Sequence, residues 1–201
     1  MPKKVVQKKR FSLRKEYIKS WNYIKDSKKF IFIIIGLFFL FAFIGFFIPA
    51  PNYISQQILI YIQSLVSQTS SMSSFKLISF IFFNNIQSSL LGLILGVFFG
   101  IFPVFVALVN GYLLGFVANG SVKANGIIIL WKLFPHGIFE LPAVFISLGL
   151  GMKLGSLLLS KEKNVFKDNF INALRVFLLV VLPLLVIAAI IEGSLIVILN
   201  H

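Results

Sequence analysis

The sequence lacks cysteine and has few charged residues. Its 201 residues include no cysteine, only six acidic residues and 12% charged residues in all. Without cysteine, disulfides, thiolate nucleophiles and cysteine-ligated metal sites are excluded. Soluble domains carry about 25% charged residues, so this chain has too little charge to cover a water-facing surface. A soluble enzyme and a soluble nucleic-acid-binding domain are therefore excluded, although the formal net charge is +13.

What the chain has instead is long apolar runs. Hydrophobic residues make up 58% of it, and no charged residue occurs in residues 30–75 or 77–122. A membrane-spanning helix needs about 20 apolar residues. We therefore predict an all-α, polytopic transmembrane helical bundle in residues 30–201. The five spans are expected at about residues 30–48, 77–100, 104–118, 137–159 and 176–199.

The basic charge is concentrated ahead of the first span. Residues 1–29 contain eleven basic and two acidic residues with interleaved aromatic residues, and Ile18, Trp21 and Ile24 recur near helical spacing. Basic segments stay on the cytoplasmic side of a membrane, so we predict a cytoplasmic N-terminal segment containing a short interfacial helix. Binding of anionic lipid or of an acidic partner is the alternative interpretation. Nucleic-acid binding is not expected, because topology already explains these charges.

Orientation follows from the number of spans. Five spans place the basic segment 160–175 inside, and the C-terminus and the uncharged segment 49–75 outside, in a plasma-membrane protein. Residues 54–65 have the pattern of an amphipathic helix with an uncharged polar face, which we expect on the outer surface; a partner-binding helix is the alternative. Residues 120–126 are predicted as a turn. Residues 127–134 are too short to cross and are predicted as a re-entrant or interfacial piece.

Several polar residues fall inside the predicted spans. Buried polar groups in a membrane are costly, so each needs a structural or functional reason. The predicted orientation puts them at a similar depth in the outer half of the bundle, where we expect one cluster facing the interior. The cluster comprises Asn85, Asn110, His136, Glu140 and Glu192. It provides either hydrogen bonds that fix helix order or a site for a proton, an ion or a polar head group. His136 and Glu140 alone are too few ligands for a metal.

Glycines recur at four-residue spacing. Such spacing gives a helix a smooth face that allows close helix packing, either within a monomer or across a dimer. A phosphate-binding interpretation is rejected because no strand precedes the glycines. The glycines and prolines assigned to packing or to a shared motif are Gly92, Gly96, Gly111, Pro135, Gly137, Pro142 and Gly151.

Two ordered motifs resemble the stage II sporulation protein M family. The first is Asn85 … Gly92-x-x-x-Gly96 … Pro103 … Asn110-Gly111 … Gly115. The second is Pro135-His136-Gly137-x-x-Glu140-Leu141-Pro142-Ala143, followed by Gly149-x-Gly151. The match covers residues 84–155. The resemblance implies a five-span integral membrane protein. In spore-forming bacteria it further implies a scaffold that acts with peptidoglycan-degrading partners during engulfment, although the family also includes proteins from organisms that form no spores.

Three functional hypotheses follow. The first is a non-enzymatic scaffold for cell-envelope or membrane remodelling, expected as a homodimer with envelope-remodelling protein partners and without a cofactor. The second is a transporter or channel component for an ion, a proton or a small polar or lipidic molecule, which uses Glu140 and Glu192 and predicts a water-accessible cavity at Glu140. The third, ranked lowest, is an intramembrane enzyme that uses His136 and Glu140 as acid and base.

Overall fold

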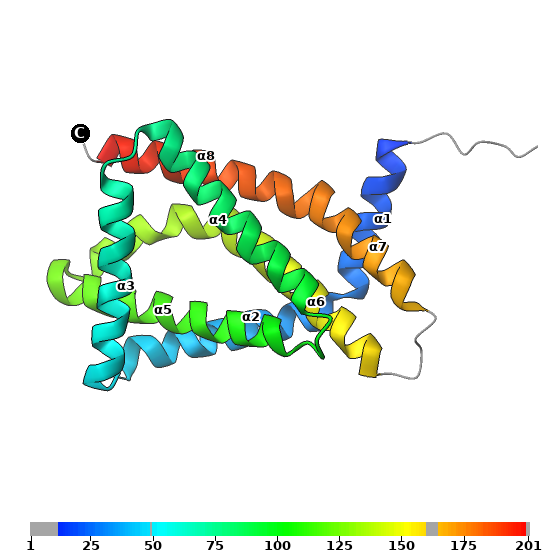
Figure 1. The fold of residues 1–201 in the computed structure, drawn as a ribbon, viewed down its shortest axis with the longest axis horizontal. Coiled ribbons are helices and arrows are strands. Elements are labelled where there is room, and N and C mark those ends of the chain that lie inside the picture. Colours follow the sequence, from blue (N-terminus) through cyan, green and yellow to red (C-terminus); the bar gives the residue numbers. More distant parts are fainter. Residues whose placement is uncertain (1–11, 49, 160–164, 200–201) are drawn as a thin grey trace, which may run out of the picture.

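The computed structural model describes residues 12–48, 50–159 and 165–199, without the side chains of residues 131–136, 193 and 195–199. This part of the chain is helical and contains no strand (Figure 1). The elements are α1 (Leu13–Asp26), α2 (Lys28–Phe47), α3 (Asn52–Ser70), α4 (Ser74–Leu95), α5 (Ile101–Asn125), the 3-10 segment η1 (Ile127–Leu133), α6 (Phe134–Leu159), α7 (Phe166–Val176), the π-helical segment η3 (Phe177–Val181) and α8 (Leu182–Leu199).

Five helical segments are long and apolar enough to cross a membrane. They are Lys28–Phe47, Ser74–Leu95, Ile101–Asn125, Gly137–Leu159 and Phe166–Glu192. Large apolar side chains such as Phe32, Phe83 and Phe105 are exposed on them, as expected for helices that face lipid rather than water. The predicted all-α, five-span fold is confirmed, and the protein is a multi-pass membrane protein.

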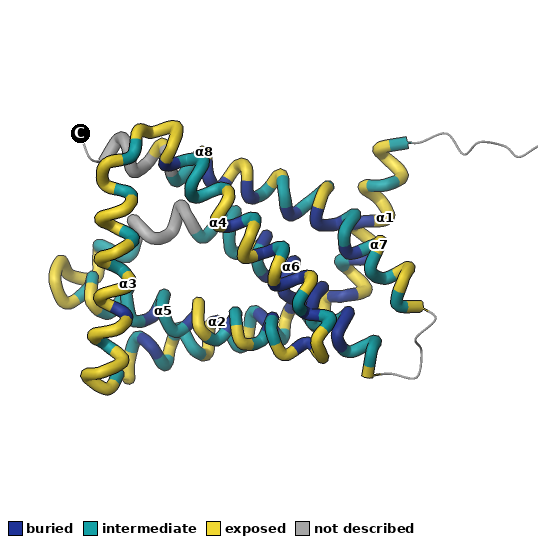
Figure 2. The backbone as a smooth tube through the Cα atoms, in the orientation of Figure 1, coloured by how far each residue is buried: buried dark blue, intermediate teal, exposed yellow. Residues whose placement is uncertain are grey.

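The spans run between two distinct ends (Figure 1). At one end, called the α1 end, lie α1, α7 and the turn 96–100. At the other, called the α3 end, lie α3, η1 and the C-terminal part of α8. Helix α6 packs against α2, α4, α5 and α8. Half of the residues in its apolar stretch are buried, whereas the buried share is 22% in α2 and in α4. Figure 2 accordingly shows the buried residues concentrated along α6, whereas α3 is largely exposed.

Glycines set the closest helix contacts, and these contacts lie within the monomer. A Cβ atom added to Gly111 or Gly115 on α5 would overlap the carbonyl oxygen of Phe38 or Ala42 on α2. One added to Gly96 on α4 would overlap the backbone of Gly151 on α6. The pairs α2–α5 and α4–α6 therefore approach as closely as glycine allows. These glycines therefore pack helices against each other within the monomer.

The predicted turn at residues 120–126 is wrong for most of its length. Helix α5 continues to Asn125, and only Gly126 leaves the helix, with a φ of 78° that favours glycine. The nearby Gly120 stays helical with open space around it. Glycine in a helix costs only about 1 kcal/mol, which the remainder of a long helix offsets. The third span is therefore longer than the predicted residues 104–118.

The second span is shorter than predicted. Helix α4 ends at Leu95, and residues 96–100 form the turn that leads to α5. Gly100 has a φ of 71°, the left-handed conformation that reverses the chain at low cost. Pro103 then lies in the first turn of α5, where a proline without an N–H group is tolerated. The chain therefore turns a few residues before Pro103, between Gly96 and Gly100.

The last span begins earlier than predicted and contains a π-helical segment. Helix α7, η3 and α8 follow one another without a gap, so residues 166–175 of the predicted polar segment 160–175 are helical. The π-helical segment Phe177–Val181 ends two residues before Pro183, which lacks the N–H group that an α-helical turn would use. The last span thus departs from regular α-helical geometry close to its proline. Residues 160–164 lie outside the described residues.

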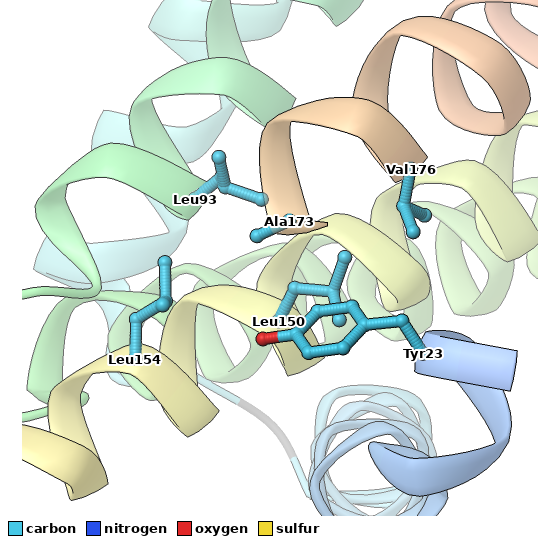
Figure 3. Close-up of a cluster of buried hydrophobic side chains, with 6 residues drawn as sticks. All are labelled: Tyr23, Leu93, Leu150, Leu154, Ala173 and Val176. Carbon is cyan, nitrogen blue, oxygen red and sulfur yellow. The ribbon is translucent and has the colours of Figure 1, made fainter. Parts of the chain in front are cut away.

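Helix α1 is docked across the α1 end of the bundle. Tyr23 is buried in a cluster with Leu93, Leu150, Leu154, Ala173 and Val176 (Figure 3). The Nζ atom of Lys153 lies 4.1 Å from the centre of the Tyr23 ring and donates a 3.0 Å hydrogen bond to Ser27 Oγ. Burial raises the pKa of the Tyr23 hydroxyl above its usual range. The interfacial helix predicted from the sequence is therefore also part of the core.

A salt bridge adds a pH-sensitive contact between α1 and α7. Lys19 Nζ and Arg175 Nε lie 2.6 and 2.5 Å from the Glu16 carboxylate. The hydrogen bond from Lys19, with the charge of Arg175, lowers the pKa of Glu16 below 4.5. The contact therefore stabilises the docking of α1 fully at any pH above the ordinary glutamate pKa. This stabilisation is lost as the pH falls through the lowered pKa of Glu16.

We expect amide hydrogen exchange in α1 to accelerate as the pH is lowered below about 4.5, the ordinary value for a glutamate. In the Glu16→Gln variant, α1 exchange is faster at neutral pH and lacks this additional pH dependence, after correction for intrinsic exchange rates. Asp168→Asn, which removes an exposed carboxylate of α7, should behave like the wild type. An unchanged profile in Glu16→Gln would show that the salt bridge contributes nothing to docking.

Candidate ligand site: a polar cavity within the membrane

The polar residues of α4 and α6 meet between these two packed helices. The side chain of Asn85 on α4 is buried and lies close enough to Glu140 on α6 for its amide to interact with the carboxylate. One helical turn or more toward the α1 end, Ser147 Oγ donates a 2.7 Å hydrogen bond to the carbonyl oxygen of Ser89. The glycine contacts of α4 and α6 lie further toward the same end. The close packing thus fixes the register that brings Asn85 to Glu140.

Next to this pair the bundle contains a large cavity, which we call the intramembrane cavity. Its volume is about 870 Å³. Residues of helices α2, α4, α5 and α6 form its walls. Helix α2 packs against α5, and α4 packs against α6 and α8. The lining residues are Phe38, Phe39, Asn84, Asn85, Ser88, Val106, Asn110, Leu114, Ala118, Leu130, Gly137, Ile138, Glu140, Leu141, Pro142, Val144 and Phe145.

Of the five residues predicted to form a polar cluster, the structure brings four into one region. Asn85, Asn110 and Glu140 line the cavity. Glu192 on α8 is near enough to Glu140 for the two carboxylates to repel each other. The side chain of His136 lies outside the described residues. The assignment of these residues to a functional site remains a prediction.

Asn110 differs from Asn85 in its local hydrogen bonding. Its Nδ2 atom donates a 2.9 Å hydrogen bond to the carbonyl oxygen of Val106, one turn earlier in α5. This bond satisfies one donor of the amide within its own helix. The carbonyl oxygen of the same amide can accept a hydrogen bond from a ligand. Asn110 is therefore suited to contribute an acceptor to the cavity.

The cavity lies within the depth of the spans. At about 1.5 Å per residue, Asn85 lies about 16 Å along α4 from Ser74, and Glu140 about 9 Å along α6 from Phe134. Both helices begin at the α3 end, so Glu140 lies in the half of the bundle nearest that end and Asn85 lies near the middle of α4. A hydrocarbon core is about 30 Å thick. Glu140 is consequently placed where an ionisable group indicates function.

The donor set limits the chemistry that the cavity can support. Among the described lining residues, the polar groups are amide, hydroxyl and carboxylate groups, and none is basic. Among the described residues, no group of three or more His, Asp or Glu side chains could hold a metal ion. The cavity therefore offers hydrogen-bond acceptors and negative charge beside apolar walls.

Several cavity residues were not singled out from the sequence, among them Ser88, Phe38 and Phe39. Ser88 follows Asn84 by one helical turn, so helical spacing could have placed it on the same face. Phe38 and Phe39 carried no such signal, because the chain contains 24 phenylalanines and most apolar residues in a span face lipid. Only the packing of α2 on α5 distinguishes these two phenylalanines from the others.

Comparison with known proteins identifies a family. The family model described as Stage II sporulation protein M matches residues 33–195. Comparisons with curated proteins and with solved structures give no match. The family match covers most of the chain and includes all the cavity-lining residues, and it confirms the resemblance found in the two sequence motifs.

Proposed function

Because the chain belongs to the stage II sporulation protein M family, we propose that it is a non-enzymatic membrane scaffold for envelope or membrane remodelling. The observation that supports this proposal is the exposure of helix α3. Only Ile58 of its residues is buried, and α3 makes few contacts with the rest of the described chain. Apolar residues such as Leu59, Ile60 and Val66 are exposed on it.

The chemistry of α3 fits a binding helix. It carries no charged residue, and its polar positions are serine, threonine, asparagine and glutamine. An amphipathic helix of this kind can bury its apolar face in a partner without desolvating charge. We propose two occupants consistent with a scaffold, a second copy of this chain in a homodimer and an envelope-remodelling protein outside the membrane.

The proposal includes an orientation. The basic residues of α1, namely Arg14, Lys15, Lys19 and Lys25, lie at the α1 end together with Lys28 and Lys29 at the start of α2. Basic residues flank spans on the cytoplasmic side. We therefore propose that the protein lies in the plasma membrane with its α1 end in the cytoplasm and that α3, η1 and the C-terminus are outside.

Site-specific photo-crosslinking tests the scaffold function. A photoreactive residue is placed at Ile60 on α3, which is 58% exposed, and for comparison at Phe32 on α2, which is 67% exposed. We expect Ile60 to crosslink to a second copy or to an envelope-remodelling protein identified by mass spectrometry, and Phe32 to crosslink to lipid. Lipid adducts alone at both positions, together with a monomer in nanodiscs, would refute the scaffold proposal.

The cavity favours a second candidate function, that of a transporter or channel component. A cavity that reaches Glu140 is what this hypothesis requires, and the structure has one of about 870 Å³. The test is flux of protons, ions or small polar solutes into liposomes that contain the protein. Flux that disappears in Glu140→Gln supports this function, and its absence in the wild type counts against it.

A further inference from the structure

The size of the intramembrane cavity limits what it can hold. Its volume of about 870 Å³ lies within the range of about 300–1,000 Å³ found for sites that bind organic ligands. A water molecule occupies about 30 Å³ in the liquid, so a proton relay or a single ion would use only a small part of this space. The cavity therefore fits an organic molecule better than an ion.

The lining has two chemically different parts. One part carries hydrogen-bonding groups, and its residues are Asn84, Asn85, Ser88, Asn110 and Glu140. The rest is apolar and includes Phe38, Phe39 and Phe145, of which Phe38 and Phe145 pack edge to face with ring centres 5.0 Å apart. A ligand that matches both parts has a polar head and an apolar body.

The charge of the polar part selects the head. Glu140 contributes a carboxylate, Glu192 lies near enough to repel it, and none of the lining residues whose side chains the structure describes is basic. A phosphate or carboxylate placed against Glu140 would be repelled. An ammonium group would be attracted, could donate hydrogen bonds to carboxylate and amide oxygens, and could also interact with the aromatic rings.

The rim of the cavity suits entry from the bilayer. Phe39 on α2 is 52% exposed and Ile138 on α6 is 48% exposed, although both line the cavity. Leu130 of η1 also lines it, so the cavity extends from the middle of the spans toward the α3 end. An amphiphile in that leaflet could therefore reach Glu140 with its head while its apolar body remains among apolar side chains.

We propose that the intramembrane cavity binds an amphiphile with a protonated amine head, which Glu140 and Asn85 hold while Phe38, Phe39 and Phe145 contact its apolar body. The inference deepens the second candidate function, because it names a ligand class for the same cavity. It does not require that the ligand be moved across the membrane. The amine could belong to an aminophospholipid or to a free long-chain amine.

Photolabelling of the full-length protein in phosphatidylcholine nanodiscs tests this inference. The probe is a long-chain primary amine with a diazirine and an alkyne, and the matched control probe is the alcohol of the same chain. We expect the amine to label α4 or α6 about tenfold more than the alcohol, since a charge-assisted contact is lost in the alcohol. Equal labelling by the two probes would overturn the inference.

Variants distinguish the contact with the ligand's amine head from the space that the cavity offers to the whole ligand. Glu140→Gln keeps the shape but removes the charge, and should reduce amine labelling about tenfold, to the level of the alcohol. Ala118→Phe narrows the cavity and retains Glu140, so it should reduce labelling by both probes. Asp168→Asn, a carboxylate change outside the cavity, should label like the wild type. Full amine labelling in Glu140→Gln or, if that variant does not fold, in Ala118→Phe would overturn the inference.

Competition identifies the source of the amine. Suppression of labelling by phosphatidylethanolamine in the nanodisc indicates a lipid ligand, and suppression only by an unlabelled long-chain amine indicates a free amine. Suppression by neither would overturn the inference. Amine binding without flux in liposomes would refute the transport function but not this inference. Proton flux without amine binding would refute this inference but not the transport function.

Discussion

Replacing Gly115 by alanine is expected to destabilise the protein by about 1–3 kcal/mol, the usual cost of overpacking. The added Cβ atom would overlap the carbonyl oxygen of Ala42 and lie 2.8 Å from the amide nitrogen of Phe46. Both are backbone atoms of α2, so neither can rotate away as a side chain would. The helices α2 and α5 must separate, and the hydrogen bond from Asn119 Nδ2 to the carbonyl oxygen of Phe46, 2.8 Å long, is strained or lost.

The same chain provides matched controls for this experiment. Gly120 is also in α5, and Gly36 is in α2, and neither has an atom within 4 Å of an added Cβ. Alanine at either position should change the stability by less than about 1 kcal/mol, and with a stabilising sign, because alanine favours a helix over glycine. Thermal unfolding in detergent measures all three variants. Similar melting temperatures for Gly115→Ala and Gly120→Ala would contradict the close contact between α2 and α5.

These glycines show how far the sequence alone could predict the fold. A repeat of small residues indicates that a helix has a smooth face, but it does not identify the helix that covers that face. The structure pairs α5 with α2 and α4 with α6. The five spans were predictable because hydrocarbon requires long apolar runs. Their exact ends were not, since the turn at 96–100 contains two left-handed residues, Phe99 and Gly100, and α5 ends only before Gly126.

The candidate site was predictable to a similar extent. A carboxylate or an amide inside a span stands out because it is costly there, so the sequence singles out Asn85, Asn110, Glu140 and Glu192 as candidates. The cavity beside them was not predicted, because its presence depends on how α2, α4, α5 and α6 pack together. The contact of Lys153 with Ser27 and Tyr23 was also missed. It joins residues that are distant in the sequence and share no periodic pattern.

Single cysteines are expected to be labelled from opposite sides of the membrane at the two ends of the bundle. The chain has no native cysteine, so Ser70→Cys at the end of α3 and Val165→Cys before α7 each give one reactive thiol, at positions that are both exposed. With a membrane-impermeant maleimide, Ser70→Cys should react in intact cells. Val165→Cys should react only after permeabilisation.

The physical reason for this all-or-none result is the charge of the α1 end. Each basic residue near an anionic inner leaflet contributes about 1 kcal/mol, and six of them lie between Arg14 and Lys29. Reversing the protein would place these charges outside. Labelling of Val165→Cys but not Ser70→Cys in intact cells would refute the proposed orientation. That result would place the cavity in the inner leaflet and α3 on the cytoplasmic side, where it could not bind a partner outside the membrane. This measurement therefore decides which partners and which leaflet the other experiments should address.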